Sequence, residues 1–186
     1  PPFGADFAVE LARRHAQMLE KRPESNPGQF KLEPNRAGGT WFVDPHLVRG
    51  TLIEGSMLAR SIPEGLARAI YYSFFVTEVH PFNDGNGRIS RLVMNAELSR
   101  VGEARIIIPT LFHEEYVDCQ RQLSGQNNPA GIIRALSLMQ QWTVAFDYAD
   151  VNALIEAVRH TNALERSRVQ FRLTMPDGSP LGSKET

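Results

Sequence analysis

The sequence predicts an all-α fold that carries one small β-hairpin, and two observations support this assignment. Apolar residues recur at helical spacing through most of the chain, and residues 63–79 are apolar on nearly every face. Such a segment belongs at the centre of a helical domain. Strand-like alternation is confined to residues 29–43, where turn-forming residues separate two short β-prone segments.

The first part of the chain is expected to form a helix and then the hairpin. Phe7, Leu11 and Met18 can share one face of a helix over residues 5–21, with charged residues on the other faces. Prolines and a glycine that follow soon afterwards end this helix. The next expected elements are a hairpin over 29–43, with strands at 29–32 and 40–43, and a helix over 46–60.

The rest of the chain is expected to be helical. Pro63 suits the first turn of the apolar helix, and helical spacing resumes at Arg88, so residues 63–101 form the centre of the fold. We expect one domain over residues 1–174, because the final residues 175–186 contain two prolines, two glycines and little to bury, which predicts a flexible tail. Further helices are expected over 112–123, 130–148 and 151–168.

Composition gives no indication of a nucleic-acid-binding, disulfide-bonded or membrane protein. Of the 186 residues, 42% are hydrophobic and 22% are charged, and the net charge of -1 gives no general attraction to nucleic acid. Cys119 is the only cysteine, so no intrachain disulfide can form, and we expect a cytoplasmic protein. The sequence has no run of about 18 apolar residues and no signal-peptide pattern, so we expect no membrane partner.

The segment from His80 to Arg91 reads HPFNDGNGRISR and lies between two apolar helices. A helix that restarts here presents unpaired backbone N–H groups and the positive end of its dipole, and both attract phosphate. Gly85 and Gly87 let the backbone approach an anion closely. Arg88 and Arg91 lie about one helical turn apart and can grip consecutive phosphates. The segment therefore predicts a polyphosphate site suited to displacement at phosphorus.

Three further side chains in this segment have distinct physical uses. Asp84 offers a hard oxygen ligand beside the phosphates, which suits Mg²⁺, and it can also cap a helix. His80 is the only group in the segment that can take a proton near neutral pH. Phe82 is interpreted as an apolar peg that fixes the loop to the core.

This segment resembles the signature of the Fic family, in which a histidine, a phenylalanine, an acidic residue, Gly-Asn-Gly and two arginines have the same spacing. The order of hairpin, long buried helix, motif and later helices is also similar, over roughly residues 29–168. The resemblance implies a Fic-type helical domain with a hairpin flap next to the active site. It also implies a protein adenylyltransferase, which moves AMP from ATP to a hydroxyl group of another protein.

The resemblance further implies a role for each motif residue. His80 would be the general base that takes the proton from a Ser, Thr or Tyr hydroxyl of the target protein. Asp84 would hold Mg²⁺ between the α- and β-phosphates, Arg88 would bind the β-phosphate, and Arg91 the γ-phosphate. Asn86 and the amides around it would stabilise the α-phosphate. The implied nucleotide-binding residues are Asn83, Asp84, Gly85, Asn86, Gly87, Arg88 and Arg91.

The flap implied by the resemblance would hold the target segment by strand addition, with Gly38, Gly39 and Thr40 near the modified residue. Trp41 and Phe42 either touch the target or anchor the hairpin to the core. The motif leaves open the transfer of UMP, GMP or phosphocholine by the same loop. A nucleotide-binding module that transfers nothing is the alternative from another functional class, and assembly into a homo-oligomer is open.

Many Fic proteins carry an inhibitory helix with a Ser or Thr four residues before a glutamate. Thr161 and Glu165 have this spacing on the expected C-terminal helix, although Arg166 follows where a glycine or asparagine is usual. Thr51 and Glu54 have one residue too few between them. We therefore expect Thr161 and Glu165 to share one helix face and to be the inhibitory pair, with a solvated helix face as the alternative interpretation.

Overall fold

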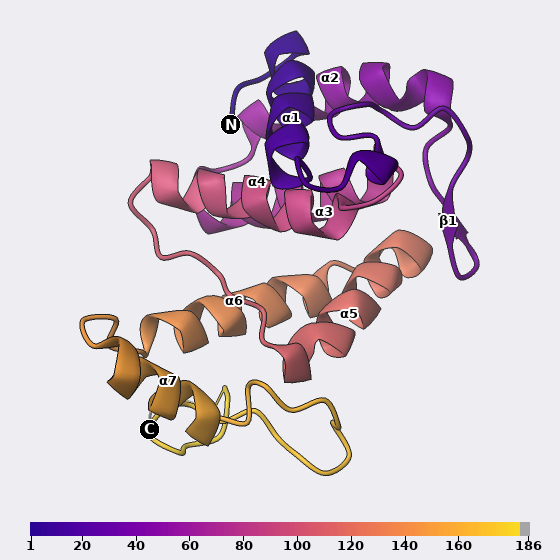
Figure 1. Ribbon diagram of the computed structural model, residues 1–186. Coiled ribbons are helices and arrows are strands. Elements are labelled where there is room, and N and C mark those ends of the chain that lie inside the picture. The colour runs from indigo at the N-terminus through magenta and orange to yellow at the C-terminus, as the bar shows by residue number, and fades with distance from the viewer. Residues whose placement is uncertain (183–186) are drawn as a thin grey trace. The chain divides into compact units, whose positions relative to one another are not determined.

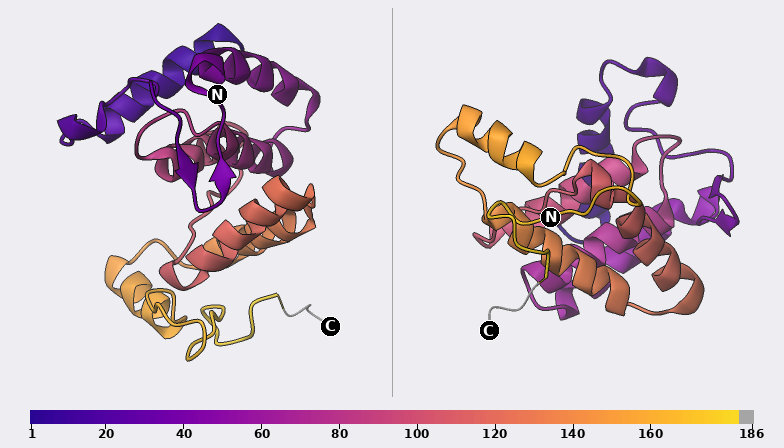
Figure 2. Two further views of the ribbon diagram at one scale, coloured as in Figure 1. Left: turned by 90° about the vertical axis from the view of Figure 1, so that its right-hand side faces the viewer. Right: turned by 90° about the horizontal axis from the view of Figure 1, so that it is seen from below.

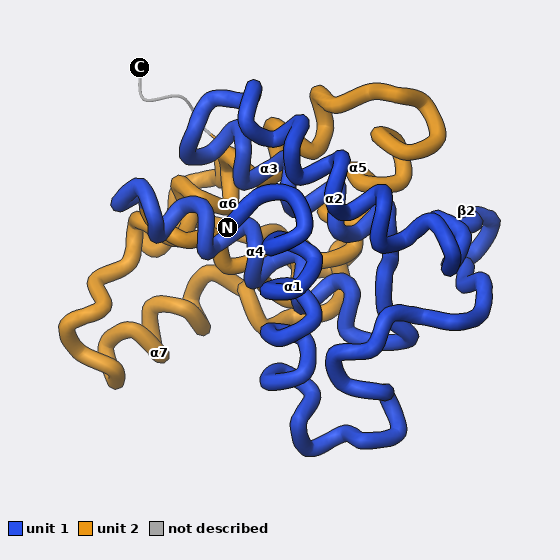
Figure 3. The backbone as a smooth tube through the Cα atoms, turned by 90° about the horizontal axis from the view of Figure 1, so that it is seen from above, with its two compact units in different colours: residues 1–103 blue, residues 104–186 orange. Residues whose placement is uncertain are grey.

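The computed structural model describes residues 1–182. The chain divides into two compact units, residues 1–103 and residues 104–186 (Figure 3). The described residues contain seven α-helices and one two-stranded antiparallel hairpin, which confirms the expected all-α fold class with a small hairpin. A single domain over residues 1–174 stays a prediction.

The first unit is built on two buried helices that run side by side, α3 (Leu66–Val79) and α4 (Asn86–Arg100). Helix α1 (Ala5–Met18) contacts α2 (Val48–Leu58) and α4, and α2 also contacts α3 (Figure 1). This arrangement puts the short connection between α3 and α4 beside the end of α1. The motif predicted from the sequence occupies that connection.

The core of this unit explains which residues allow the helices to pack closely. Phe7 of α1 stacks on Tyr72 of α3, with ring centroids 5.5 Å apart. Gly55 of α2 lies against Phe75 of α3, and a Cβ there would sit 2.2 Å from the phenylalanine ring. A side chain larger than hydrogen at Gly55 would therefore push α2 away from α3.

Helix α3 begins later than expected, at Leu66, because Gly65 takes a φ of 83° and no helix can continue through it. The N–H of Gly65 donates to the Glu97 carboxylate at 3.4 Å, which ties the start of α3 to the end of α4. Arg100 binds the same carboxylate at 3.0 Å. The α3–α4 pair is thus fixed at the end opposite to the motif.

The hairpin consists of β1 (Arg36–Ala37) and β2 (Thr40–Trp41), and it stands out from the helices (Figure 2). The expected first strand at residues 29–32 is wrong. The backbone N–H of Lys31 donates to the carbonyl of Pro81 at 2.8 Å, so this segment bonds to the motif loop and not to a second strand. Alternation of apolar and polar residues does not distinguish these two kinds of partner.

The second unit contains α5 (His113–Gln126) and α6 (Ala130–Val144), which pack against each other, and α7 (Val151–His160). Asp150 caps α7 by accepting from the N–H groups of Asn152 and Ala153. The expectation of a helix to residue 168 is wrong. Asn162 takes a φ of 62°, and the chain turns back so that the N–H of Thr174 donates to the carbonyl of Thr161 at 3.2 Å.

The last described residues form a turn. An isolated bridge pairs Thr174 with Pro180, and the N–H of Met175 donates to the carbonyl of Ser179 at 2.9 Å. Residues 183–186, which belong to the expected flexible tail, lie outside the described residues. No helix within residues 1–182 is both long enough and apolar enough to cross a membrane.

Candidate active site

The connection between α3 and α4 has two residues in left-handed backbone conformations. His80 ends α3 with a φ of 48°, and its N–H donates to the carbonyl of Val76 at 3.1 Å. Gly85 precedes α4 with a φ of 78°, and no side chain caps the start of that helix. The first backbone N–H groups of α4 therefore lack a side-chain cap, and together with the helix dipole they can attract an anion.

The imidazole of His80 is held in one tautomer. Its Nδ1 lies 3.1 Å from the carbonyl oxygen of Thr77, which can only accept, so Nδ1 carries the proton. In the neutral ring Nε2 then has a free lone pair, as a general base requires. Burial lowers the pKa of His80, the bond to Thr77 opposes this, and the charge of Lys31 lowers it further. The ring is therefore neutral at physiological pH.

Asp84 lies at the centre of a small group of charges. Its Oδ1 accepts from the N–H of Gly85 at 2.6 Å, and its Oδ2 accepts from Arg88 at 3.1 Å and from Arg22 at 2.9 Å. The bond from Gly85 lowers the pKa of Asp84, and the two arginine charges lower it further. The carboxylate is partly exposed and ionised at neutral pH.

Asp84 is the only residue of the motif that offers a carboxylate to a Mg²⁺ ion. No group of three His, Cys, Asp or Glu side chains in residues 1–182 could hold a metal by itself. Mg²⁺ usually keeps water and binds through one or two carboxylates together with substrate phosphates. One ionised, partly exposed carboxylate beside the start of α4 fits an ion that arrives with a nucleotide.

Arg88 and Arg91 both lie on the first turns of α4. The side chain of Arg88 is 43% exposed and bonds only to Asp84 within the described residues. Arg91 is half-buried, and its Nη1 would lie 3.4 Å from a Cβ added at Gly87. The sequence prediction that both guanidinium groups share the start of one helix agrees with these positions.

Asn86 has a different role from the one expected for its side chain. Its Oδ1 accepts from the N–H of Phe82 at 2.9 Å, and its Nδ2 donates to the carbonyl of Phe82 at 2.7 Å. The side chain is buried and closes the motif loop, so it is not free to bind a phosphate. The backbone N–H of Asn86 stays available at the start of α4.

Phe82 and His15 anchor this loop to α1. Phe82 is fully buried, and its ring stacks on that of His15 with centroids 3.7 Å apart and planes 2° apart. His15 Nδ1 accepts from the N–H of Gly28 at 3.0 Å, so its Nε2 carries the proton and donates to the carbonyl of Asp84 at 2.9 Å. The prediction that Phe82 is an apolar peg agrees with this packing.

Four residues of the site were missed by sequence reasoning: His15, Arg22, Lys31 and Asn35. His15 follows Leu11 by four positions on the apolar face of α1, so its helical phase indicated burial. The other three are in irregular segments and have no motif spacing. Their contacts with the loop depend on how the chain folds back.

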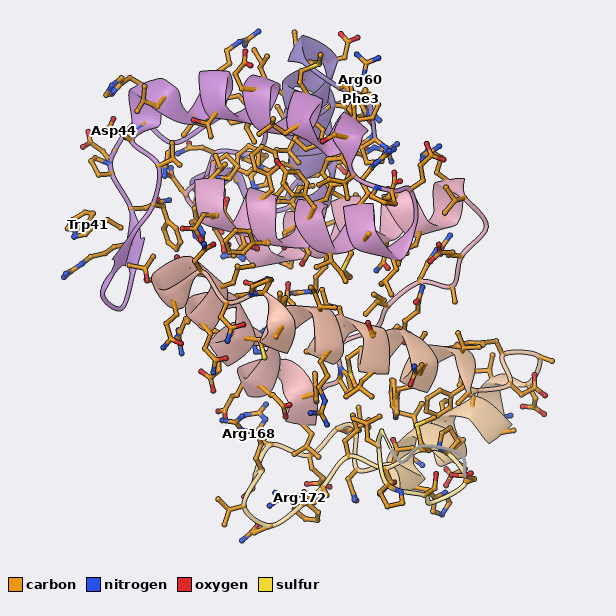
Figure 4. All side chains as sticks on the ribbon, turned by 180° about the vertical axis from the view of Figure 1, so that it is seen from behind. Phe3, Trp41, Asp44, Arg60, Arg168 and Arg172 are labelled. Carbon is orange, nitrogen blue, oxygen red and sulfur yellow. The ribbon has the colours of Figure 1, made fainter. Side chains whose placement is uncertain are left out.

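The flap residues Gly38, Gly39 and Thr40 form the tip of the hairpin, where Ala37 pairs with Thr40. Nothing lies within 4 Å of a Cβ added at Gly38 or Gly39, so the tip is open. Trp41 is 65% exposed and points away from the helices (Figure 4). It therefore does not anchor the hairpin.

Phe42 has the opposite role. Its ring stacks on the imidazole of His80 with centroids 3.8 Å apart and planes 7° apart. The backbone N–H of Phe42 also donates to the carbonyl of Asn35 at 3.2 Å. Of the two aromatic residues, Phe42 anchors the hairpin, and it does so directly on the predicted base.

Thr161 and Glu165 do not share a helix face, because α7 ends at His160. Thr161 is buried and its Oγ1 donates to the carbonyl of Val158, whereas Glu165 is exposed on the segment that follows the turn at Asn162. The expected inhibitory pair therefore lacks the geometry on which it was based. Asn83, the remaining predicted nucleotide-binding residue, is exposed in the motif loop.

Comparisons with known proteins give the same family for this site. Residues 8–98 match the sequence profile of the Fic/DOC family. A protein adenylyltransferase Fic of Aedes aegypti is 30% identical over 106 residues, which cover 57% of this chain and 19% of that protein. One of Drosophila persimilis is 46% identical over 48 residues, which cover 26% of this chain and 9% of that protein. The matched part is thus less than a fifth of either relative.

Solved structures share the fold at low sequence identity. Fic-1 from C. elegans has a TM-score of 0.62 at 21% identity, covering 82% of this chain and 44% of that one. The Bartonella tribocorum effector BepC, solved with bound AMPPNP, has a TM-score of 0.60 at 15% identity, covering 75% of this chain and 76% of that one. At these identities the similarity concerns the fold.

Proposed function

Because the chain belongs to the Fic/DOC family, we propose that it is a protein adenylyltransferase, which transfers AMP from ATP to a hydroxyl group of a target protein. The observation that carries this proposal is the pairing of two features in one short loop. A neutral imidazole with a fixed tautomer ends α3, and the uncapped start of α4 follows with two arginines on its first turns. The first feature can take a proton, and the second can hold polyphosphate.

The phosphates of ATP would bind at the start of α4. The backbone N–H groups from Asn86 onward support the α-phosphate, and Arg88 and Arg91 bind the β- and γ-phosphates. Gly87 leaves the space that a Cβ would occupy beside Arg91, so the backbone can approach the phosphates. Asp84 would hold Mg²⁺, which when bound neutralises phosphate charge.

The chemical step is an in-line displacement at the α-phosphorus. Nε2 of His80 takes the proton of the target hydroxyl, the hydroxyl oxygen forms a bond to the α-phosphorus, and the bond to the β-phosphate oxygen breaks. Pyrophosphate leaves, and AMP stays on the target through a phosphodiester bond. The low pKa of His80 supports this role, because the ring is neutral and ready to accept a proton.

The open hairpin tip supports the proposal that the target segment lies along the flap. Gly38 and Gly39 carry no side chains and connect β1 to β2, and an extended peptide can join the edge of this hairpin. Phe42 then connects the hairpin to the base. A target segment on the flap would therefore lie close to His80.

Radioactive ATP tests the proposal. The protein is incubated with Mg²⁺ and either [α-³²P]ATP or [γ-³²P]ATP, alone and with an added protein extract as acceptor. We expect covalent label from the α-position alone and none from His80→Ala. Label from the γ-position would indicate a kinase, and nucleotide binding without any label would indicate a binding module. Equal incubations with GTP, UTP and CTP establish the preferred base.

A further inference from the structure

Lys31 is buried at the base of the hairpin, with 2% of its surface exposed. Lysine is rarely buried this fully unless it is paired with a carboxylate. Here the ammonium donates to Oδ1 of Asn35 at 2.6 Å and to the carbonyl of Val79 at 3.4 Å, and both acceptors are neutral. Within the described residues, the free-energy cost of burying this charge is therefore not offset by an ion pair. The role of Lys31 then depends on the groups that its hydrogen bonds hold in place.

The contacts of Lys31 and Asn35 cover every carbonyl of the motif loop from residue 79 to residue 82. The Lys31 ammonium reaches the carbonyl of Val79, and the Lys31 backbone N–H reaches that of Pro81 at 2.8 Å. Nδ2 of Asn35 donates to the carbonyls of His80 at 3.3 Å and Phe82 at 3.1 Å. Two residues from the hairpin side thus hold four consecutive carbonyls.

This loop needs such support because His80 has a backbone conformation that non-glycine residues rarely adopt. Its φ of 48° costs free energy that the surroundings must supply. Asn35 also accepts from the N–H of Phe42, the residue whose ring lies on the His80 imidazole. The same asparagine therefore fixes the backbone of His80 and the aromatic ring against its side chain.

We propose that Lys31, acting through Asn35, is a positioning residue for His80: together they hold the backbone of residues 79–82 and the Phe42 ring so that the imidazole is placed for proton transfer. This rests on the proposed function, in which His80 is the general base. Lys31 touches neither the nucleotide site nor Asp84. Its effect reaches the reaction through the loop that it holds.

The charge of Lys31 also favours the form of His80 that can accept a proton, in addition to the support that its hydrogen bonds give to the loop. The positive charge lowers the pKa of His80 and so favours the neutral imidazole. Burial lowers the pKa of Lys31 itself, and the nearby Asp44, which follows the hairpin, opposes that change. Asp44 and His80 are the titratable groups whose charges are coupled to Lys31. A neutral residue at this position would remove both the carbonyl contact and the charge.

The test combines imidazole titration by NMR with enzyme kinetics. In Lys31→Met we expect the pKa of His80 to rise, the backbone amide signals of Val79, His80 and Phe82 to move, and kcat to fall about 10-fold while KM for ATP changes less than about 2-fold. Lys21→Met is the matched control, because Lys21 is exposed in the turn after α1 and the substitution changes net charge equally. It should leave all four quantities at their wild-type values.

Asn35→Ala separates the contacts from the charge, since it removes the Nδ2 group that donates to the carbonyls of His80 and Phe82 and keeps the lysine. It should move the same amide signals and lower kcat. If Lys31→Met does not fold, Asn35→Ala alone tests whether these contacts position His80. The proposal would be overturned if both variants kept wild-type amide signals at Val79, His80 and Phe82 together with wild-type kcat. If Asn35→Ala is the only variant that folds, the same result in that variant alone would overturn it. The NMR measurements need no ATP, so a wild-type protein that transfers nothing would contradict the proposed function and leave this test standing.

Discussion

The ring of Phe42 lies flat on the imidazole of His80, with centroids 3.8 Å apart and planes 7° apart. This contact joins the hairpin to the predicted base. Any movement of the hairpin therefore acts on the group that must accept the proton. It also covers one face of the imidazole and contributes to the burial that lowers the pKa of His80.

Removing this ring should impair proton transfer more than nucleotide binding. In Phe42→Ala we expect kcat for AMP transfer to fall about 10-fold with KM for ATP nearly unchanged, because the phosphates bind at α4. The acid limb of the pH–rate profile should move to higher pH, since an exposed imidazole regains its ordinary pKa. Phe42→Tyr retains the stacked ring and should restore both quantities. Equal losses in the two variants would show that stacking is not the cause.

The stability of the protein should fall in mild acid. Burial is the first cause that lowers the pKa of both His15 and His80 below the ordinary 6.5, so between those lowered values and 6.5 the unfolded chain binds more protons than the folded one. The stabilising contribution is present above pH 6.5 and is lost as the pH falls through the lowered pKa values. Urea unfolding at pH 7 and pH 5.5 measures this change.

A free energy of unfolding that is the same at both pH values would contradict the assigned burial of the two imidazoles.

The side chain of Asn86 should contribute to the free energy of unfolding, although its place in the motif predicts a role in phosphate binding. Asn86→Ala leaves the N–H of the buried Phe82 without its partner, while the Phe82 carbonyl keeps its bond from Asn35, so the loss should be about 1 to 3 kcal/mol of unfolding free energy. Chemical denaturation measures the loss, and the exposed neighbour Asn83→Ala should change stability by less than about 0.5 kcal/mol. A fully stable Asn86→Ala variant with weaker ATP binding would instead show that the Asn86 side chain binds the phosphates.

Arg22 should compete with a cation for Asp84. Its Nη1 lies 2.9 Å from Oδ2 of Asp84, the oxygen that also accepts from Arg88. In Arg22→Ala we expect AMP transfer to reach half of its maximum at about 2- to 5-fold lower Mg²⁺ concentration, because a competing partly exposed ion pair is gone. A Mg²⁺ titration of activity checks this. A raised KM for ATP in Arg22→Ala would instead make Arg22 a nucleotide ligand.

Much of the fold and the chemistry-bearing motif could be predicted from the sequence, because both depend on local patterns. Apolar periodicity located the helices, and the His80–Arg91 spacing located the loop between two of them. The first strand at residues 29–32 failed for a tertiary reason, since the N–H of Lys31 has its partner on Pro81, far along the chain. Local alternation contains no information about that partner.

The supporting residues of the site could not be predicted for the same reason. Lys31, Asn35 and Arg22 act on the motif from segments with irregular backbone, and nothing in their spacing connects them to it. The end of α7 was missed because Asn162 turns the chain, and asparagine tolerates that left-handed conformation without any glycine to mark it.

The most direct test of the central claim measures ATP affinity and AMP transfer on the same His80→Ala protein. We expect a Kd for ATP within about 2-fold of wild type, because the phosphates bind at the start of α4, and a transfer rate reduced about 1,000-fold by loss of the base. Arg91→Ala should show weaker ATP binding in the same assay. Transfer at the wild-type rate by His80→Ala would contradict the account.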